Sequence, residues 1–231
     1  MKKILIANWK ANPATLEEAR RLFEIENKEN VIICPPAIYI AELRPNGAQD
    51  VFWKAGAHTG QLSPEMLAQF GVTHILVGHS ERRAIGETDE QINKKLKAAL
   101  SVGLTPILLI GEPEKGPALT DYLIDQLTRD LEGVSTEDAK KILFCYEPVW
   151  AIGNQASTPE YAKKAIHEMH GILEKIYHLP ITIYQFLYGG STNAENIESF
   201  LKNSEISGAV VGGASLRPEE FKKMIDITAK L

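Results

Sequence analysis

The sequence predicts an α/β fold, a single (β/α)8 barrel that occupies all of residues 1–231 as one domain. Short apolar runs alternate with amphipathic stretches along the whole chain, which is typical of repeated βα units around a parallel sheet. Eight such runs give about 29 residues per unit. No low-complexity tract or charge block marks a domain boundary, so the pattern favours one compact barrel over an open doubly wound sheet.

The strand candidates are short, and most are rich in Ile, Val, Leu or Phe, as strands buried on both faces should be. The third candidate has the weakest pattern. In chain order they are Ile4–Asn8, Val31–Cys34, Gln49–Trp53, His74–Val77, Thr105–Ile110, Ile142–Glu147, Ile181–Tyr188 and Gly208–Val211.

The helical stretches between the strands begin with recognisable signals. A Ser, Thr or Asn, and once an Arg, precedes Pro, acidic or other helix-favouring residues, which suits an N-cap and a first helical turn. The predicted starts follow Thr15, Ser63, Thr88, Thr158, Asn193 and Arg217.

Composition narrows the class of protein. With 25 Lys+Arg against 30 Asp+Glu, the chain has a net charge of −5 and no basic stripe, which argues against a nucleic-acid partner. No apolar run reaches the ~18 residues that span a bilayer, and the apolar run near the N-terminus is too short for a signal peptide. Cys34 and Cys145 lie inside apolar runs without CxxC or zinc spacing, so we expect buried, reduced thiols and a cytoplasmic location.

In barrels of this kind the functional groups stand where the strands run out into loops. Residues of one parity along a strand face the same side of the sheet. If the apolar members of three such series fill the barrel interior, the polar residues that end them enter its mouth. The series are Ile4, Ile6, Asn8 and Lys10; Ile75, Val77 and His79; and Leu143, Cys145 and Glu147.

Glu147 and His79 are the candidate acid–base pair. Glu147 ends an apolar run, and burial there would raise its pKa towards that of a useful proton acceptor. His79 precedes a predicted helix start, where the positive helix end favours the neutral ring. A strand-end Glu that pairs with a cation and a buried structural His are the alternatives. His167 and His170 lie three residues apart without an apparent third ligand, so we expect no metal site.

Two glycine pairs, Gly189-Gly190 and Gly212-Gly213, close the last two strands. Glycine lets backbone N–H groups approach an anion closely, and the loops after strands 7 and 8 are the usual phosphate site of such barrels. Tight turns with nothing bound are the alternative for each pair alone. Because both pairs stand at the same place, directly after a strand, a phosphate site is favoured.

Five segments, in this order along the chain, give a resemblance to the triosephosphate isomerase family from end to end. The segment Ala57-His58-Thr59-Gly60 resembles that family's dimerisation loop. The five segments are Asn8-Trp9-Lys10, Gly78-His79-Ser80-Glu81-Arg82-Arg83, Tyr146–Gly153, Tyr188-Gly189-Gly190-Ser191 and Gly212-Gly213-Ala214-Ser215-Leu216.

The resemblance implies a TIM barrel that interconverts dihydroxyacetone phosphate and D-glyceraldehyde 3-phosphate without a cofactor, as a homodimer. Glu147 would be the base and neutral His79 the electrophile, and the family is itself the standard example of this pairing. Asn8 and Lys10 would orient the substrate and stabilise negative charge, and Glu81 would pair with Lys10. The remaining implied roles are phosphate binding by backbone N–H groups of Gly153, Ser191, Gly212 and Gly213, a lid from Pro148 to about Thr158, and lid latching by Tyr188 and Ser191.

Two departures from the family pattern stand in the sequence. The run Asn154–Thr158 is one residue shorter than is usual before Pro159, and Gln61 stands where a glutamate is common. Two other functions remain open. One is another phosphate-binding barrel, such as a pentose-phosphate epimerase or a tryptophan-pathway enzyme, and the other is a non-catalytic binding module. An epimerase needs metal ligands at several strand ends, so activity in chelator separates it from an isomerase.

Overall fold

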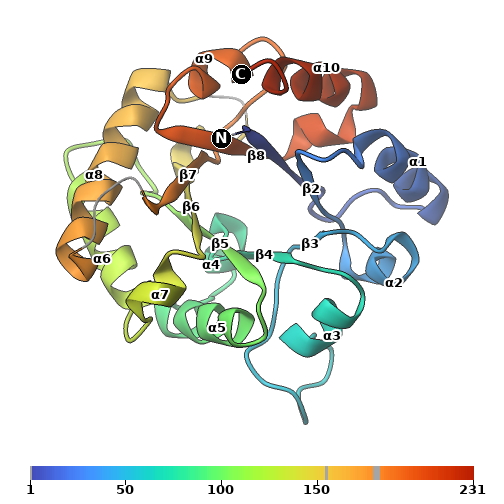
Figure 1. The fold of residues 1–231 in the computed structure, drawn as a ribbon, viewed down its shortest axis with the longest axis horizontal. Coiled ribbons are helices and arrows are strands. Elements are labelled where there is room, and N and C mark those ends of the chain that lie inside the picture. The colour runs from blue at the N-terminus through green and yellow to red at the C-terminus, as the bar shows by residue number, and fades with distance from the viewer. Residues whose placement is uncertain (1, 154–155, 179–182) are drawn as a thin grey trace.

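The computed structural model describes residues 2–153, 156–178 and 183–231. Eight parallel strands form one sheet in the order β2-β1-β8-β7-β6-β5-β4-β3, and the sheet curls into a nearly closed barrel ringed by helices (Figure 1). The predicted fold class is confirmed. The strands are β1 Ile4–Asn8, β2 Val31–Cys34, β3 Gly47–Ala48, β4 His74–Val77, β5 Thr105–Ile110, β6 Leu143–Tyr146, β7 Gln185–Tyr188 and β8 Ile206–Val211.

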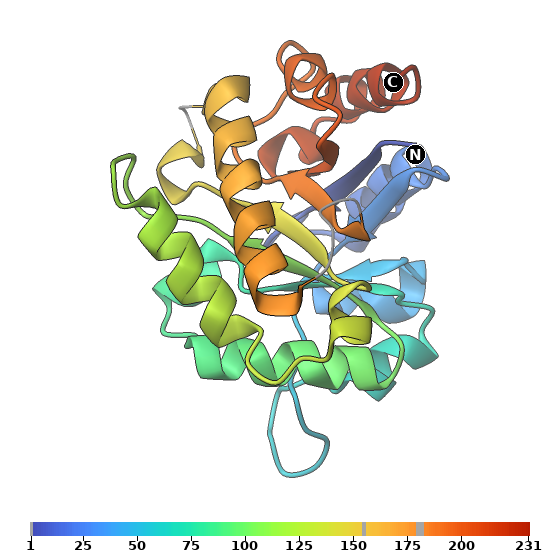
Figure 2. The same ribbon diagram turned by 60° about the vertical axis from the view of Figure 1, so that its left-hand side comes forward.

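The helices lie on the outside of the barrel, and α6 and α8 run side by side along one flank (Figure 2). Among the described helices, none has the length and apolar character that crossing a bilayer requires. The α-helices are α1 Leu16–Glu26, α2 Ile40–Leu43, α3 Pro64–Gln69, α4 Ser80–Ala84, α5 Asp89–Ser101, α6 Leu119–Asp130, α7 Thr136–Ala139, α8 Pro159–Tyr177, α9 Ile197–Leu201 and α10 Pro218–Thr228. Short 3-10 helices are η1 Ala37–Tyr39, η2 Val149–Ala151 and η4 Gly213–Leu216.

The predicted helix starts agree with the observed caps in most cases. Thr15, Ser63, Thr88 and Thr158 each accept a hydrogen bond from the backbone N–H of the third residue of the helix that follows. Arg217 precedes α10 but makes no side-chain cap. Asn193 caps a turn instead, because its Oδ1 accepts from the N–H groups of Glu195 and Asn196, and α9 begins only at Ile197.

A side-chain amide closes the barrel between β2 and β3. Asn46 Oδ1 accepts from Ile33 N at 2.9 Å, and Asn46 Nδ2 donates to Val31 O at 2.8 Å. These two bonds satisfy the edge of β2 in place of a backbone ladder. Gly47 permits the approach, since a Cβ there would lie 2.7 Å from Cys34 Sγ and 2.9 Å from Ile33 O.

The predicted third strand is wrong in position. The strand is Gly47–Ala48, and Gln49–Trp53 lies in the segment that follows it. Directly after β3, Gln49 Nε2 donates to the carbonyls of Lys10 and Cys34. The apolar character of the run reflects packing, with Val51 buried and Phe52 stacked on Trp53, rather than strand formation.

The predicted bounds of β1, β2, β4 and β5 are confirmed, and those of β6, β7 and β8 shift by one to a few residues. Of the run predicted as Ile181–Tyr188, only Gln185–Tyr188 is strand, and residues 181–182 lie outside the described residues. β6 is one residue shorter at each end than predicted, and β8 begins two residues earlier.

The barrel interior corrects the predicted parity of β4. Its cluster consists of strand residues alone, including Ile6, Cys145 and Leu76. Ile75 and Val77, predicted inside, pack instead in the larger cluster beneath the helices. His79 still enters the mouth because the left-handed backbone of Gly78, with φ +78°, breaks the alternation.

Candidate active site

A cavity of about 440 Å³ opens at the carboxyl ends of the strands and collects residues from both halves of the chain. The sequence-predicted catalytic and phosphate-binding residues all line it: Asn8, Lys10, His79, Glu147, Gly153, Ser191, Gly212 and Gly213. Glu81 and Tyr188 lie behind this lining and contact its members or the lid.

Glu147 and His79 meet at the bottom of the cavity. Glu147 Oε1 lies 3.1 Å from His79 Nε2, and its Oε2 accepts from Ser80 N at 2.9 Å. Both side chains are buried, with 5% and 8% of their surface exposed. Burial raises the pKa of Glu147 to about 7, against the lowering effect of the hydrogen bonds from Ser80.

The His79 ring is held in one tautomer. It stands at the N-cap of α4, where its Nδ1 accepts from Glu81 N at 3.1 Å. The neutral ring therefore carries its proton on Nε2, the nitrogen that faces Glu147. Burial, with a smaller contribution from the charge of Lys10, lowers the pKa of His79 to about 4. The ring is thus a neutral hydrogen-bond donor near pH 7.

Lys10 brings a cation into the same cavity. Its backbone has φ +54°, and its backbone N–H donates to Asn8 Oδ1 at 3.1 Å, which holds the Asn8 side chain in place. Lys10 Nζ forms an ion pair with Glu81 Oε1, the pairing that the resemblance implied. A Cβ on Gly212 would lie 3.4 Å from Lys10 Cε, so the ammonium stem runs alongside the second glycine pair.

The lid segment rests on the loop after β7. Ser191 N donates to Ala151 O at 2.9 Å, and Ser191 Oγ donates to Gly153 O at 2.9 Å. Further along, Ser157 N donates to the Tyr188 hydroxyl at 3.3 Å. Residues 154–155 of the predicted lid lie outside the described residues.

Sequence reasoning missed Glu112 as the anchor of the lid. This fully buried carboxylate accepts from Trp150 Nε1 at 2.6 Å and from the hydroxyls of Tyr146 and Tyr161. Glu112 O also accepts from Val149 N at 3.0 Å, so one residue after β5 holds the whole η2 turn. The one sequence signal for a role of Glu112 was its position two residues after the end of β5.

Several further cavity residues had no individual role predicted, although Ile152 and Ala156 fall within the predicted lid. They follow the strands β7 and β8, or lie in the lid, and a side chain's place in these loops was the only signal for them. They are Ile152, Ala156, Thr192, Asn193, Asn196, Ala214 and Arg217. Within the described part of the chain, no three His, Cys, Asp or Glu side chains gather as a metal ion would require.

The comparisons with known proteins agree on one family. The triosephosphate isomerase family model matches residues 3–228. Proteins named triosephosphate isomerase from Dictyoglomus thermophilum and Caldanaerobacter subterraneus subsp. tengcongensis are 40% and 38% identical to this chain. The matched regions cover 97% and 96% of this chain and 98% of each relative. The chain belongs to the triosephosphate isomerase family.

The triosephosphate isomerase relationship extends over all eight strands and every cavity residue named above, since the matched residues include them. A protein of that name from Synechococcus is 37% identical over 99% of this chain and 96% of its own length. The family is one of isomerases, so membership gives the site its reaction class. The arrangement is suited to that class: a base of raised pKa, a neutral donor and a cation face one cavity.

Proposed function

We propose that this chain interconverts dihydroxyacetone phosphate and D-glyceraldehyde 3-phosphate, with Glu147 as the base and neutral His79 as the electrophile. The observation that carries the proposal is the contact of 3.1 Å between Glu147 Oε1 and His79 Nε2 inside the cavity. A triose that displaces this contact and lies against both groups would present a carbon-bound proton to the carboxylate and its carbonyl oxygen to the imidazole N–H.

In the proposed reaction Glu147 removes a proton from the carbon next to the carbonyl, and His79 Nε2–H donates to the carbonyl oxygen. The electron pair of the broken C–H bond forms the C–C double bond of an enediolate, and the π pair of the carbonyl moves onto its oxygen. Glu147 then returns the proton to the neighbouring carbon, while a proton moves between the two oxygens through the ring. Glu147 gives back the proton it took and His79 regains the proton it gave, so the cycle leaves both unchanged.

Asn8 and Lys10 act on the charge that develops. The Lys10 ammonium and the Asn8 amide line the cavity together, and a cation near the reacting oxygens stabilises an enediolate more than the ketone. The Lys10–Glu81 ion pair holds the ammonium in place.

The phosphate group occupies the other end of the cavity, next to Gly212 and Gly213. Backbone N–H groups of Gly153, Ser191, Gly212 and Gly213 bind it in this proposal. The Ser191 N–H donates to Ala151 O in this structure, so phosphate binding through Ser191 requires the η2 turn to release that bond. Substrate binding and lid rearrangement are thereby coupled, with Tyr188 and Ser191 as latches.

The protein forms a homodimer through the loop Ala57-His58-Thr59-Gly60 in the same proposal. The segment between β3 and α3 projects from the barrel in both views, and most of its tip is exposed (Figures 1 and 2). A cavity of about 290 Å³ beside its base, lined in part by Gln49, Gln61 and Arg82, offers a second copy's loop a place to bind. The cytoplasmic location and the single domain over residues 1–231 belong to this proposal.

An isomerase assay tests the proposed reaction. Purified protein in EDTA is given either triose phosphate, and both isomers are followed. We expect interconversion in chelator, and a fall in kcat of roughly 10²- to 10⁴-fold in Glu147→Gln, since that is the usual contribution of a general base. Glu132→Gln, which changes an exposed carboxylate, is the matched control. No interconversion by the wild type, or wild-type turnover in Glu147→Gln, would overturn the proposal.

A further inference from the structure

The backbone immediately before His79 makes a left-handed turn at a glycine. Gly78 has φ +78°, in the region that side-chain-bearing residues rarely adopt. A Cβ there would lie 3.1 Å from Leu109 O and 3.3 Å from Arg83 Nη2, so the guanidinium packs directly against this turn. The turn is what redirects His79 from the parity of β4 into the cavity.

Arg83 bonds to the turn on two sides. Its Nε donates to Gly78 O at 3.0 Å, and its backbone N–H donates to His79 O at 3.1 Å. These two acceptors flank the His79 Cα, so their positions fix the direction in which the imidazole leaves the backbone. The bond to Gly78 O belongs to the side chain, whereas the bond to His79 O is the backbone bond of α4 that residue 83 makes with any side chain. Arg83 lies outside the cavity lining.

The rest of the guanidinium is held by two helices. Nη2 donates to Asp130 Oδ2 at 2.7 Å at the end of α6, and Nη1 pairs with Asp89 at the start of α5. Asp130 is fully buried, and Arg83 itself is 19% exposed. A planar fork reaches three acceptors in fixed directions, which a lysine ammonium cannot reproduce.

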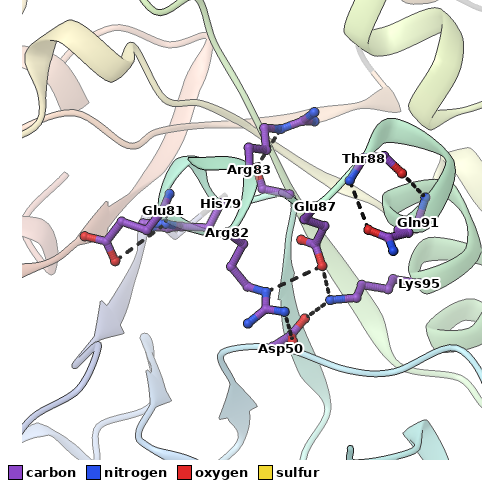
Figure 3. A network of polar contacts seen from close by, with 10 residues as sticks. Asp50, His79, Glu81, Arg82, Arg83, Glu87, Thr88, Gln91 and Lys95 are labelled. Atoms are coloured by element: carbon purple, nitrogen blue, oxygen red, sulfur yellow. Dashed lines mark hydrogen bonds and ion pairs between the residues drawn. The ribbon is translucent and has the colours of Figure 1, made fainter. Parts of the chain in front are cut away.

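Arg83 is separate from the larger ion network nearby. Its neighbour Arg82 pairs with Asp50 and Glu87, which also hold Lys95, whereas Arg83 points the other way (Figure 3). A buried ion pair contributes little net stability, because desolvation offsets much of the attraction. Burial raises the pKa of Asp130 to about 7 against the opposing charge of Arg83, in keeping with that cost. A geometric role explains the arrangement better than a stabilising one.

We propose that Arg83 is a positioning residue for His79, anchoring the Gly78 carbonyl to α5 and α6 so that imidazole Nε2 is held at the substrate's carbonyl oxygen. The inference rests on the proposed function. It assigns Arg83 to the chemical step and leaves phosphate binding to the loops after β7 and β8.

Steady-state kinetics and NMR of Arg83→Lys test this role. The variant keeps the charge and loses the fork. We expect kcat to fall about 10- to 100-fold with KM changed less than about threefold, since small misplacements of a reacting group cost that much. The ¹⁵N and ¹H resonances of His79 Nε2–H should shift. Arg129→Gln removes an exposed cation that pairs with Asp89 and Asp125 without touching Gly78, and should change neither kcat nor the resonances.

The inference is overturned if Arg83→Lys lowers thermal stability but leaves kcat and the His79 resonances unchanged. It is also overturned if Arg83→Lys raises KM alone, or if Arg129→Gln has the same effects as Arg83→Lys. If Arg83→Lys does not fold, Asp130→Asn retains every side-chain shape and must show the same split between kcat and KM. An inactive wild type would contradict the proposed function. An active wild type with an unaffected Arg83 variant would contradict the positioning role alone.

Discussion

Glu147 and His79 illustrate how one physical cause gives two groups different roles. Burial disfavours charge on both, so it raises the pKa of the carboxyl and lowers that of the imidazole. The carboxyl becomes a stronger base that still ionises near neutral pH, and the imidazole stays neutral with its proton on Nε2. At the scale of single residues, desolvation is the largest cause that divides the proposed acid–base roles, and the bond from Glu81 N sets the tautomer.

The pH dependence of kcat/KM follows from these two pKa values. Glu147 must be ionised to accept a proton, so we expect kcat/KM to rise through a pKa of about 7 to a plateau at higher pH. His79 adds no second limb near neutrality, because its pKa of about 4 lies where Glu147 is already protonated.

The measurement is kcat and kcat/KM from pH 5 to 9. The substrate phosphate titrates near a pKa of ~6, so the kcat profile, which reports the bound state, separates that ionisation from Glu147. Activity that falls between pH 6 and pH 8 would contradict the assigned base.

At the scale of elements, one buried carboxylate ties β1 to α1. Trp9, directly after β1, donates its Nε1–H to Oε2 of Glu26, the last residue of α1, at 2.8 Å. Both side chains are fully buried, and Glu26 Oε1 has no hydrogen-bond partner among the described residues. Burial raises the pKa of Glu26 to about 8, against the hydrogen bond from Trp9.

Glu26→Gln should therefore change the pH dependence of stability. Between pH ~4.5 and pH ~8 the folded wild type binds a proton at Glu26 that the unfolded chain releases. This extra proton favours the folded state, so the wild-type free energy of unfolding decreases as pH rises through that window. Glutamine keeps the acceptor for Trp9 and removes the ionisation, so the variant gains stability over the wild type as pH rises, by at most ~1.4 kcal/mol per pH unit.

Urea unfolding at several values from pH 5 to pH 8 gives the free energy of unfolding of the wild type and of Glu26→Gln. The other titrating groups are the same in both proteins, so their effects cancel in the difference between the two. A difference that stays constant with pH would contradict a raised Glu26 pKa.

The elements also show where sequence patterns stop being informative. Cap residues such as Thr88 predict helix starts because their hydrogen bonds are local. The third strand was misplaced because its position depends on Asn46 bonding to β2, a contact that no local pattern encodes. The prediction of which β4 residues face the barrel interior was wrong for a similar reason. A single left-handed glycine at position 78 reverses the alternation between the strand and His79.

At the scale of the whole molecule, the site is assembled from strand ends far apart in the sequence. Asn8, His79 and Glu147 could be predicted because strand ends in such barrels converge and because their motifs resemble those of a family. The role of Glu112 could not, and Arg83 stood in a motif without a role of its own, because both act through the groups they hold. Their contacts depend on how β5, α5 and α6 pack together.

The oligomeric state is also a property of the whole molecule. We expect sedimentation velocity to give a species of about twice the 25.6 kDa chain mass, held by the loop around Thr59. Thr59→Asp should shift the distribution towards monomer, because it buries a charge in the proposed contact. Ser199→Asp on α9, on the opposite side of the barrel from that loop, is the control (Figure 1). A wild-type monomer, or equal effects of both changes, would contradict the proposed dimer.

The central claim is that the Glu147 carboxylate carries the proton between two carbons of the substrate. Turnover of dihydroxyacetone phosphate in D₂O, followed by ¹H NMR, tests it most directly, since a proton held on a carboxylate can exchange with solvent before it is returned. The claim predicts D-glyceraldehyde 3-phosphate with deuterium at C2 in part or all of the product, and near-complete loss of both product and label in Glu147→Gln. Labelled product formed at the wild-type rate by Glu147→Gln would contradict it.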